Sequence, residues 1–340
     1  MARRIIGILL LVFLVVPTSG NDVLAEIYRW RDQNGILHFS DTPPPDGLED
    51  TDSGQAPPQS PSTSGFSDAA QQETAVSGGM LWKIGGLGVK QSYLLGTIHS
   101  EDPRVLNLPD SVTEAFNSAD AFVMELEMNS NAVMAMGAAM LITGDRDLES
   151  LIGASDFNKA VSAMADYGIP ASILNRMKPW VVMSMLSMPK PKTGEFLDLM
   201  LANRAKSQGK AVHGLESAEE QMSVFEGLSI EDQVSLLKAT IQQLDDLPAM
   251  FDQLIRAYVA NDLARISALA QSYNYGVDSN LVQRFMFRLN EERNYRMVDR
   301  MMSYLNTGNA FVAVGALHLA GESGIINQLR AKGLEVTPVP

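Results

Sequence analysis

Two strand-like segments of this sequence end in the same short motif, Gly-x-x-His. They lie in SYLLGTIHS, residues 92–100, and in FVAVGALHLAG, residues 311–321. A glycine at the end of a strand permits a tight turn or the close approach of another backbone. In both segments this glycine lies three positions before a histidine, His99 in the first and His318 in the second. Because the chain contains only four histidines, the repetition predicts that these two belong to one site.

Strand-like and helix-like segments alternate between residues 80 and 340, which predicts an α/β fold with a central mixed sheet. The expected strands are residues 80–84, 89–96, 121–127, 210–216, 311–315 and 334–339. Helical patterns fill residues 129–208, where prolines interrupt them, and residues 229–306. Such long helical stretches predict a large helical insertion. Two helices should begin with capping boxes, at Ser111 and at Ser217, each three residues before a glutamate.

Two glutamates also close apolar, strand-like segments. Glu125 lies near the end of FVMELE, and Glu216 ends AVHGLE. In an open α/β sheet, ligands bind at the carboxyl ends of the strands, where His99 and His318 are also expected. Two imidazoles with one or two carboxylates are a typical ligand set of a catalytic divalent metal ion. The alternative is that each of these four residues is only a hydrogen-bonded structural group.

A third histidine and the methionines have simpler interpretations. His213 lies three residues before Glu216, and residues at odd spacing on a strand face opposite sides of the sheet, so we expect His213 to be structural. Many of the 19 methionines lie in AVMAMGAAM and WVVMSMLSM, at spacings that suit helix faces and predict core packing. The alternatives for these thioethers are a soft-metal site or an adaptable groove for peptide side chains.

Residues 1–25 predict a signal peptide. Arg3 and Arg4 precede a short apolar run, residues 5–16, and a small-residue pattern ends at Ala25. The run is too short to cross a membrane, and no later stretch reaches about 18 apolar residues. We therefore expect a periplasmic or secreted protein with no membrane span after cleavage.

Residues 26–45 predict a small β-hairpin domain, because apolar and polar residues alternate on either side of Asn34 and Gly35. The segment YRWRDQNGILHFSDTPP in this range resembles a small N-terminal domain of unknown function that is common in exported proteobacterial proteins. Residues 46–79 are rich in proline, serine and glycine and predict a disordered linker. The main domain is then expected over residues 80–340.

Composition excludes several classes of protein. The chain has no cysteine, which rules out a disulfide framework, a thiol nucleophile and a lipid anchor on an N-terminal cysteine. Its formal net charge is −14 and it has no basic stripe, so it repels phosphate backbones and nucleic acid is not expected as a partner. A peptide or a small molecule is the expected substrate, and the oligomeric state is left open.

Five blocks of the main domain resemble the TraB/GumN family, relatives of the Tiki metalloproteases. The blocks are LWKI with SYLLGTIHS, FVMELE, LDLMLANRAKSQGKAVHGLESAEEQ, ERNYRM, and FVAVGALHLAGESGIINQLRAKGLEVTPV. The motif residues of the family fall on His99, His318, Glu125, Glu216, Arg293 and Asn294. The resemblance covers the whole of the main domain and implies its fold and a metal site.

The resemblance also implies a chemistry for these residues. The two histidines and one of the two glutamates would bind a divalent ion, whether zinc, manganese or cobalt, and the other glutamate would act as general base. Arg293 and Asn294 would face the substrate oxygen; alternatively, they lie on a solvated face of a long helix. The expected function is a periplasmic metal-dependent hydrolase resembling a peptidase. The alternative is a non-catalytic binder that sequesters an exported peptide or small molecule, because TraB-like relatives are associated with blocking a peptide signal.

Overall fold

The chain divides into two units, Thr18–Ala75 and the remainder, which includes Val76–Pro340. The computed structural model describes residues 28–31, 37–40, 78–86, 88–127, 136–137, 139–272 and 276–340. The predicted signal peptide and nearly all of the predicted linker lie outside the described residues. The division into signal peptide, hairpin domain, linker and main domain therefore stays a prediction.

The smaller unit contains a two-stranded antiparallel sheet. Strand β1 (Tyr28–Arg31) pairs with β2 (Leu37–Ser40), and Arg31 lies opposite Leu37. This pairing confirms the predicted hairpin strands. The turn itself, with Asn34 and Gly35, lies outside the described residues.

The main unit is built on a six-stranded mixed sheet with the strand order β6-β5-β7-β4-β3-β8. Its strands are β3 (Leu81–Gly85), β4 (Ser92–Thr97), β5 (Ala121–Leu126), β6 (Ala211–Glu216), β7 (Ala310–Gly315) and β8 (Glu335–Pro338). The four strands from β6 to β4 are parallel, and β3 pairs antiparallel with both β4 and β8. This arrangement confirms the predicted mixed sheet.

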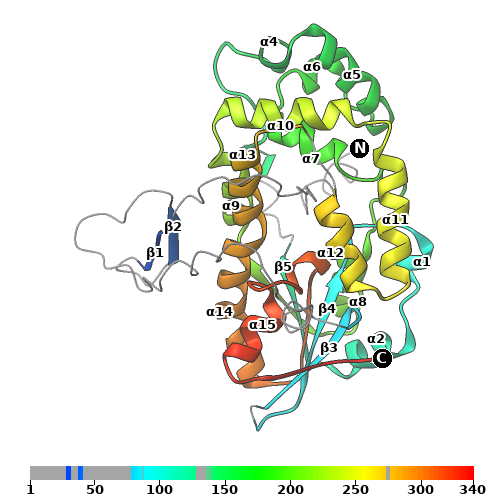
Figure 1. Cartoon of the computed structure of the whole chain (residues 1–340). Helices are drawn as coiled ribbons and strands as arrows, with labels where there is room; N and C mark the ends of the chain where they lie inside the picture. Colours follow the sequence, from blue (N-terminus) through cyan, green and yellow to red (C-terminus); the bar gives the residue numbers. More distant parts are fainter. Residues whose placement is uncertain are drawn as a thin grey trace, which may run out of the picture. The chain divides into compact units, whose positions relative to one another are not determined.

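Helices cover both faces of the sheet. On one side, α2 (Asp110–Ser118) packs against β4, and α8 (Leu197–Ser207) packs against β5 and β6. On the other side, α14 (Glu292–Thr307) packs against β6 and β7 and also contacts α15 (Ile325–Ala331). Figure 1 shows these two pairs of helices on either side of the strands. Because both faces are covered, all six residues of β7 are buried.

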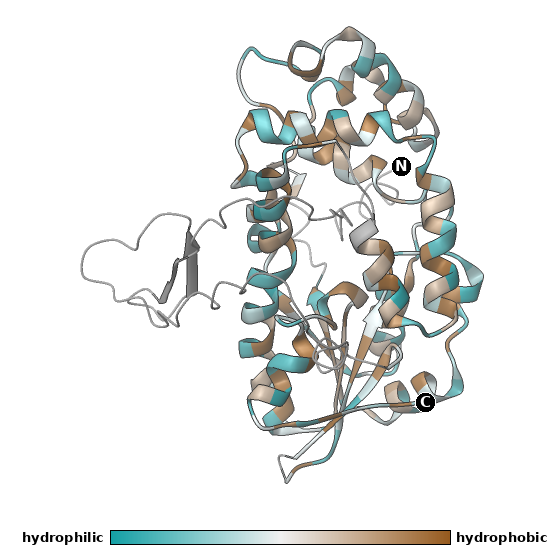
Figure 2. Ribbon diagram, in the orientation of Figure 1, coloured by the Kyte–Doolittle hydropathy of each residue, from teal (hydrophilic) through white to brown (hydrophobic). Residues whose placement is uncertain are grey.

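The helical insertion forms a second core above the sheet (Figure 1). The remaining helices are α1 (Pro103–Leu106), α4 (Leu148–Ile152), α5 (Ala154–Met164), α6 (Ala171–Leu174), α7 (Pro179–Leu186), α9 (Ala218–Glu226), α10 (Ile230–Gln242), α11 (Leu247–Val259), α12 (Leu263–Ser272) and α13 (Ser279–Met286). Every residue of α7 is buried, and Trp180 on this helix stacks on Phe225 of α9 at a centroid distance of 4.9 Å. Figure 2 shows hydrophilic and hydrophobic bands alternating along α11 and α14, as expected of helices that face both solvent and a core.

Several of the described methionines of the insertion pack into this second core, whereas part of AVMAMGAAM lies outside the described residues. Met183 and Met185 on α7 are 0% and 1% exposed, and Met164 of α5 is fully buried. The interpretation of these thioethers as core side chains is therefore confirmed for the helix interior. Met188, which follows α7, is only half-buried and differs from them in this respect.

The two predicted capping boxes have different outcomes. Ser217 caps α9, and its side chain and that of Glu220 each accept a hydrogen bond from the backbone N–H of the other. Helix α2, however, begins at Asp110 after Pro109 and has no side-chain cap. The prediction at Ser111 was wrong: Pro109, whose ring restricts φ to about the value found here (−56°), occupies the N-cap position two residues before Ser111.

The carboxyl ends of the neighbouring strands β5 and β7 form a topological switch point of the sheet. From β5 the chain proceeds to β6 on one side, whereas from β7 it proceeds through α15 towards β8 on the other. The connections therefore diverge, and ligands of open α/β sheets bind at such points. Within the described part of the chain, no helix is long and apolar enough to cross a membrane.

Candidate functional site

Glu125 bridges the ends of β5 and β7. Its Oε1 accepts a hydrogen bond from the backbone N–H of Gly315, the last residue of β7, over 2.6 Å. The side chain of Glu125 is only 4% exposed. A buried carboxylate therefore lies at the switch point, held by the backbone of the second Gly-x-x-His motif.

His318 lies next to this carboxylate, in a short 3₁₀ turn, Ala316–His318, that follows β7. Its Nδ1 lies 2.6 Å from Oδ1 of Asn294 on α14, and Nδ2 of Asn294 donates to the carbonyl of Ser323. Because the amide N–H₂ is engaged with that carbonyl, Oδ1 must accept, so Nδ1 of His318 carries the proton. The Nε2 lone pair is then left without a hydrogen-bond partner among the described residues, 3.7 Å from Oε1 of Glu125.

His318 is held in its neutral form. Burial and, to a smaller extent, the positive charge of Arg293 lower its pKa to about 3, although the negative charge of Glu216 acts to raise it. The imidazole is 0% exposed. Its Nε2 lone pair therefore remains unprotonated at any neutral pH, as a metal ligand requires.

Arg293 joins the two glutamates that the sequence singled out. Its Nη2 lies 2.5 Å from Oε2 of Glu125 and 2.7 Å from Oε2 of Glu216, and its Nε donates to the same oxygen of Glu216 over 2.9 Å. Although burial acts to lower it, the two carboxylates raise the pKa of Arg293 above its ordinary value. The side chain is buried, so the alternative of a solvated charged face is wrong.

A short π-helix, Phe287–Glu291, lies directly before α14. An extra residue in a helical turn rotates all following side chains around the helix axis, and such bulges occur often at functional sites. Here the residues after the bulge, Arg293 and Asn294, point to the sheet edge, where the first binds both glutamates and the second binds His318. The sequence predicts instead that both residues face a substrate oxygen, and it does not predict these contacts.

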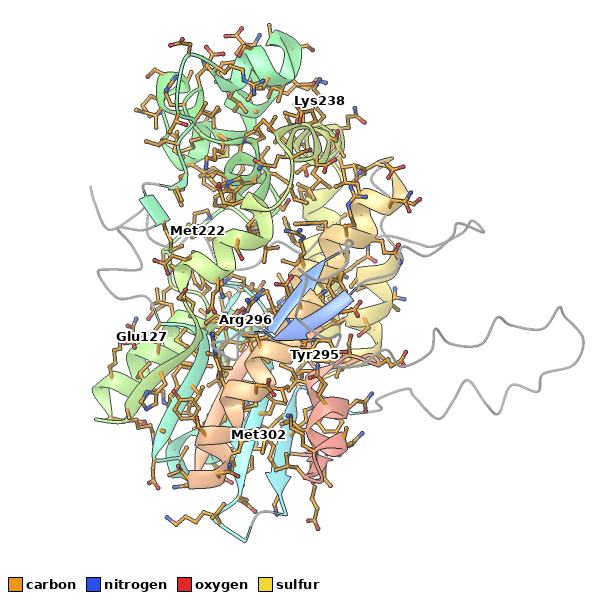
Figure 3. The ribbon with its side chains drawn as sticks, turned by 90° about the vertical axis from the view of Figure 1, so that its left-hand side faces the viewer. Glu127, Met222, Lys238, Tyr295, Arg296 and Met302 are labelled. Carbon is orange, nitrogen blue, oxygen red and sulfur yellow. The ribbon has the colours of Figure 1, made fainter. Side chains whose placement is uncertain are left out.

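Glu216 is surrounded by cationic and amide groups. Besides Arg293, Nε of Arg296 lies 3.4 Å from its Oε1, and Nε2 of Gln221 donates to its Oε2 over 3.3 Å. Figure 3 shows Arg296 on α14. With its side chain fully buried among two guanidinium groups, Glu216 acts as their counter-ion.

The first Gly-x-x-His motif lies directly beside the second. In the register of β4 with β7, Gly96 pairs with Val314 and Thr97 with Gly315. A Cβ atom on Gly96 would come within 2.6 Å of the side chain of Leu319 and 3.1 Å of the Cα of Ala316. Glycine is therefore required here because the turn that carries His318 packs against this strand.

His99 is held by the N-terminal turn of α8. Its Nδ1 lies 3.8 Å from Oδ2 of Asp198, and its ring packs against Phe196 with the centroids 3.4 Å apart. The other oxygen of Asp198 accepts a hydrogen bond from the hydroxyl of Thr97 over 2.6 Å. Tyr258 of α11 completes the support by donating to the carbonyl of Gly96. Nδ1 of His318 is thus hydrogen-bonded to Asn294, whereas Nδ1 of His99 faces the carboxylate of Asp198 at 3.8 Å, beyond hydrogen-bond distance.

A family model described as TraB/PrgY/gumN family matches residues 80–338. The chain belongs to this family. A second model, Domain of unknown function (DUF4124), matches residues 10–73, which agrees with the predicted identity of the N-terminal domain.

Among curated relatives, Metalloprotease TIKI2 of Danio rerio is 26% identical over 304 residues, which cover 73% of this chain and 58% of the relative. Metalloprotease TIKI1 of Homo sapiens is 23% identical over 303 residues, with 73% and 60% covered. Uncharacterized protein YbaP of Escherichia coli (strain K12) is 24% identical over 249 residues, with 72% and 89% covered. The chain thus spans about three fifths of the length of the Tiki relatives. No solved structure matches.

The metal that these relatives' names imply can be tested against the side chains of this TraB/PrgY/gumN protein. Nε2 of His318 and Oε1 of Glu125 are 3.7 Å apart, which suits two ligands each about 2.0–2.2 Å from one ion. These two residues fit an ion, whereas His99, on the neighbouring strand, is not grouped with them as a third ligand among the described residues. Glu216 fits less well, because its oxygens already face Arg293 and Arg296.

The site has no complete cage of acidic and histidine ligands. Within the described residues, no three His, Cys, Asp or Glu side chains are grouped so that they could hold an ion. The guanidinium of Arg293 supplies the positive charge between the two glutamates. The structure therefore brings Glu125, Glu216, Arg293, Asn294 and His318 into one hydrogen-bonded network, and places His99 at the end of the adjacent strand.

Sequence reasoning missed Asp198. It lies in LDLML, a segment that is apolar apart from this residue and reads as an ordinary helix, where a single aspartate in the first turn is expected to face solvent. The sequence does contain one sign that Asp198 is buried: it lies between two leucines, in a block that resembles the family. His213, by contrast, lies on β6 with its ring against Tyr304 at a centroid distance of 4.9 Å, in keeping with the structural role expected for it.

Proposed function

We propose that this protein is a metal-dependent hydrolase that cleaves peptides. The observation that carries the proposal is the buried, neutral His318, whose Nε2 lone pair lies 3.7 Å from Oε1 of Glu125 at the switch point of the sheet. The similarity to proteins named as metalloproteases supports it. Zinc, manganese and cobalt are all compatible with imidazole and carboxylate ligands.

Each residue of the network has a distinct part in this proposal. His318 and Glu125 would hold the ion together with His99, and such an ion would supply Lewis acidity that lowers the pKa of a water molecule. Asn294 fixes the ring of His318, and the backbone N–H of Gly315 fixes Oε1 of Glu125. Such outer partners orient ligands and tune their basicity.

Arg293 and Glu216 are best assigned to positioning. Arg293 holds Oε2 of Glu125 and thereby leaves Oε1, the oxygen nearer to His318, directed at the site. Glu216 balances the charge of Arg293 and Arg296. In this assignment the pair Arg293 and Asn294 shapes the ligands and does not contact the substrate oxygen.

We also propose that the protein acts outside the cytoplasm. The basis is the predicted signal peptide, residues 1–25, and the N-terminal domain match over residues 10–73. Cell fractionation tests this part: the full chain should appear in the periplasmic fraction, whereas a chain that lacks residues 2–25 should stay in the cytoplasm. Equal distribution of the two would contradict it.

Peptide cleavage tests the enzymatic part. Purified protein is freed of metal, reloaded with zinc, manganese or cobalt, and incubated with a mixture of peptides that is then read by mass spectrometry. We expect new peptide termini that disappear in His318→Ala and persist in His213→Ala, whose ring contacts Tyr304 away from the network. Peptides that bind but return intact from every metal-loaded sample would favour the non-catalytic binder instead.

A further inference from the structure

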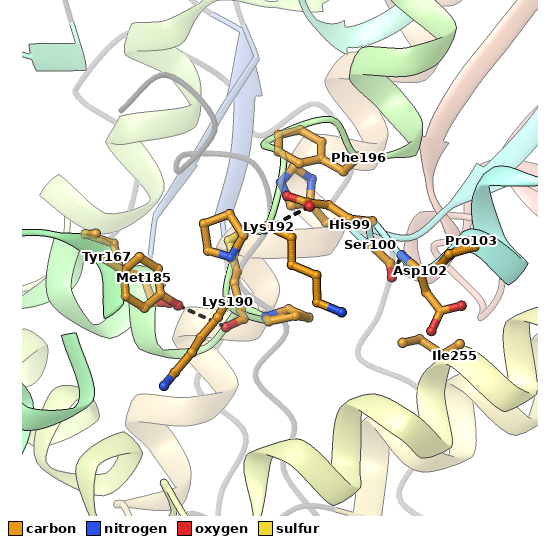
Figure 4. Close-up of a pocket in the computed structure, with 14 residues that line it drawn as sticks. His99, Ser100, Asp102, Pro103, Tyr167, Met185, Lys190, Lys192, Phe196 and Ile255 are labelled. Carbon is orange, nitrogen blue, oxygen red and sulfur yellow. Dashed lines mark hydrogen bonds between the residues drawn. The ribbon is translucent and has the colours of Figure 1, made fainter. Parts of the chain in front are cut away.

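A pocket of about 180 Å³ opens beside His99. Figure 4 shows it between the end of β4, the segment that follows α7, and α11. Its apolar walls include Tyr167, Met185, Met188, Phe196 and Ile255. The ring of Phe196 touches both the pocket and the imidazole of His99, so the pocket adjoins one of the candidate ligands.

The outer wall of the pocket is fixed by Glu101, which follows His99 by two residues. Its carboxylate accepts hydrogen bonds from three successive backbone N–H groups, those of Lys192, Thr193 and Gly194, over 2.7–2.9 Å. The hydroxyl of Thr193 donates to the same carboxylate. Because these bonds hold the segment after α7 against the end of β4, the pocket is already formed without a bound molecule.

Polar groups near the pocket are largely engaged with one another. The Tyr167 hydroxyl donates to the carbonyl of Met185 over 3.1 Å, and the Asp102 carboxylate receives two hydrogen bonds from the side chain of Arg104. With Glu101 bound to backbone N–H groups, the walls that remain combine thioether, aromatic and aliphatic groups with Ser100 and with the side chains of Lys190 and Lys192, whose methylene stems are also apolar. Such a lining binds apolar groups, and thioethers adapt to several shapes.

The size of the pocket limits what it can hold. Sites for whole drug-sized molecules measure roughly 300–1,000 Å³, so a volume of about 180 Å³ suits a single large side chain. Met188 is half-buried at this wall, unlike the fully buried Met183 in the same methionine-rich segment. One thioether of that segment is thus exposed to the pocket and not used in the core.

We propose that this pocket is a specificity subsite that binds one large apolar side chain of the substrate, of the size of leucine, methionine or phenylalanine. The inference rests on the proposed function for the substrate being a peptide and for cleavage occurring near His99. Binding of the side chain itself requires neither the metal nor turnover. The two proposals can therefore fail separately.

Methyl NMR on metal-free protein tests the subsite directly. With methionine methyl groups labelled by ¹³C, the protein is titrated with N-acetyl-leucinamide, N-acetyl-phenylalaninamide and N-acetyl-asparaginamide. We expect the methyl signals of Met185 and Met188 to move with the first two probes, and binding of the asparagine derivative to be weaker by roughly tenfold or more, because its amide gains nothing from apolar walls. Signals that do not move, or that move equally with all three probes, would overturn the proposal.

Two variants separate a subsite from a general effect. In Met188→Lys a charge enters the pocket, so the shift of Met185 with the leucine probe should be lost, whereas Met188→Leu should retain it. The signals of the other methionines report that each variant is folded. If Met188→Lys binds the leucine probe as well as Met188→Leu does, the pocket is not the binding site. Absence of peptide cleavage would contradict only the proposed hydrolase.

Discussion

Asn294 determines which ring nitrogen of His318 carries the proton. Its Oδ1 lies 2.6 Å from Nδ1 of the histidine while its amide donates to Ser323, so the imidazole keeps a free lone pair at Nε2. This relationship joins two helical segments at the end of β7 and makes Nε2 available to an ion. It is the arrangement expected of a histidine that binds metal through one nitrogen and is oriented through the other.

Removing this partner should weaken metal binding. We expect Asn294→Ala to lower the affinity for zinc by about 10–100-fold, the usual effect of losing an outer-sphere partner of a ligand. Calorimetric titration measures it. Asn158→Ala, on the exposed surface of α5, serves as the control and should bind as the unaltered protein does. An affinity unchanged in Asn294→Ala would show that Asn294 does not orient a ligand.

Asp198 should have the same effect on the other histidine. Its Oδ2 lies 3.8 Å from Nδ1 of His99, and its Oδ1 is held by Thr97. Asp198→Asn removes the negative charge near His99 but keeps a group of the same size, so we expect a loss of zinc affinity of about 10–100-fold with unchanged circular dichroism. Asp245→Asn, at an exposed position, is the matched control. Equal affinities of these two variants would remove Asp198 from the site.

Arg293 should be essential for stability. Arg293→Met leaves the buried carboxylate of Glu125 without its counter-ion and that of Glu216 with Arg296 alone, which should lower the free energy of unfolding by about 3–5 kcal/mol. Urea denaturation measures it. Arg256→Met breaks an exposed ion pair with Asp252 and should cost only about 0–1 kcal/mol. A loss in Arg293→Met as small as that of the control would mean that the glutamates do not need this cation.

Protonation of Glu220 in acid should lower the free energy of unfolding of the protein. Burial acts to raise its pKa, but hydrogen bonds from Arg300 and from the N–H of Ser217 outweigh burial and lower it below 4.5. A depressed pKa contributes stability above the unfolded value and loses it as pH falls through the folded value. We expect Glu220→Gln to be less stable than the unaltered protein by about 0.5–1 kcal/mol at pH 7, and this difference to vanish below the folded pKa.

The neighbouring residue provides the control for this pH dependence. Glu219 is exposed in the same first turn of α9, so Glu219→Gln tests the effect of a charge near the helix start without the contact to Arg300. The difference in the free energy of unfolding between Glu219→Gln and the unaltered protein should change much less between pH 7 and acidic pH. Identical pH profiles for the two variants would show that the ion pair with Arg300 contributes nothing.

Much of this arrangement could be predicted from the sequence, because strand ends carry local signals. Gly96 and Gly315 each mark the end of a strand, and parallel strands bring such ends to one edge, so the neighbouring positions of the two motifs follow from the pattern. The capping box at Ser217 is similarly local. These features depend on residues a few positions apart.

The remainder depends on contacts between distant segments. Arg293 and Asp198 lie on helices whose inner faces are set by the π-helix before α14 and by the packing of α8 against the sheet. A charged residue on a helix has no local signal of burial, so the sequence permitted a solvated Arg293 as readily as a buried one. The ion pairs of Glu216 with Arg293 and Arg296 could not be inferred for the same reason.

The central claim is that His99 and His318 bind one metal ion, and zinc titration of four variants tests it most directly. If both bind the same ion, His99→Ala and His318→Ala should each lose most of the affinity, the double variant should lose little more, and His213→Ala should bind as the unaltered protein does. Helix content should remain the same throughout. Independent, additive losses at the two histidines, or an equal loss in His213→Ala, would contradict a shared site.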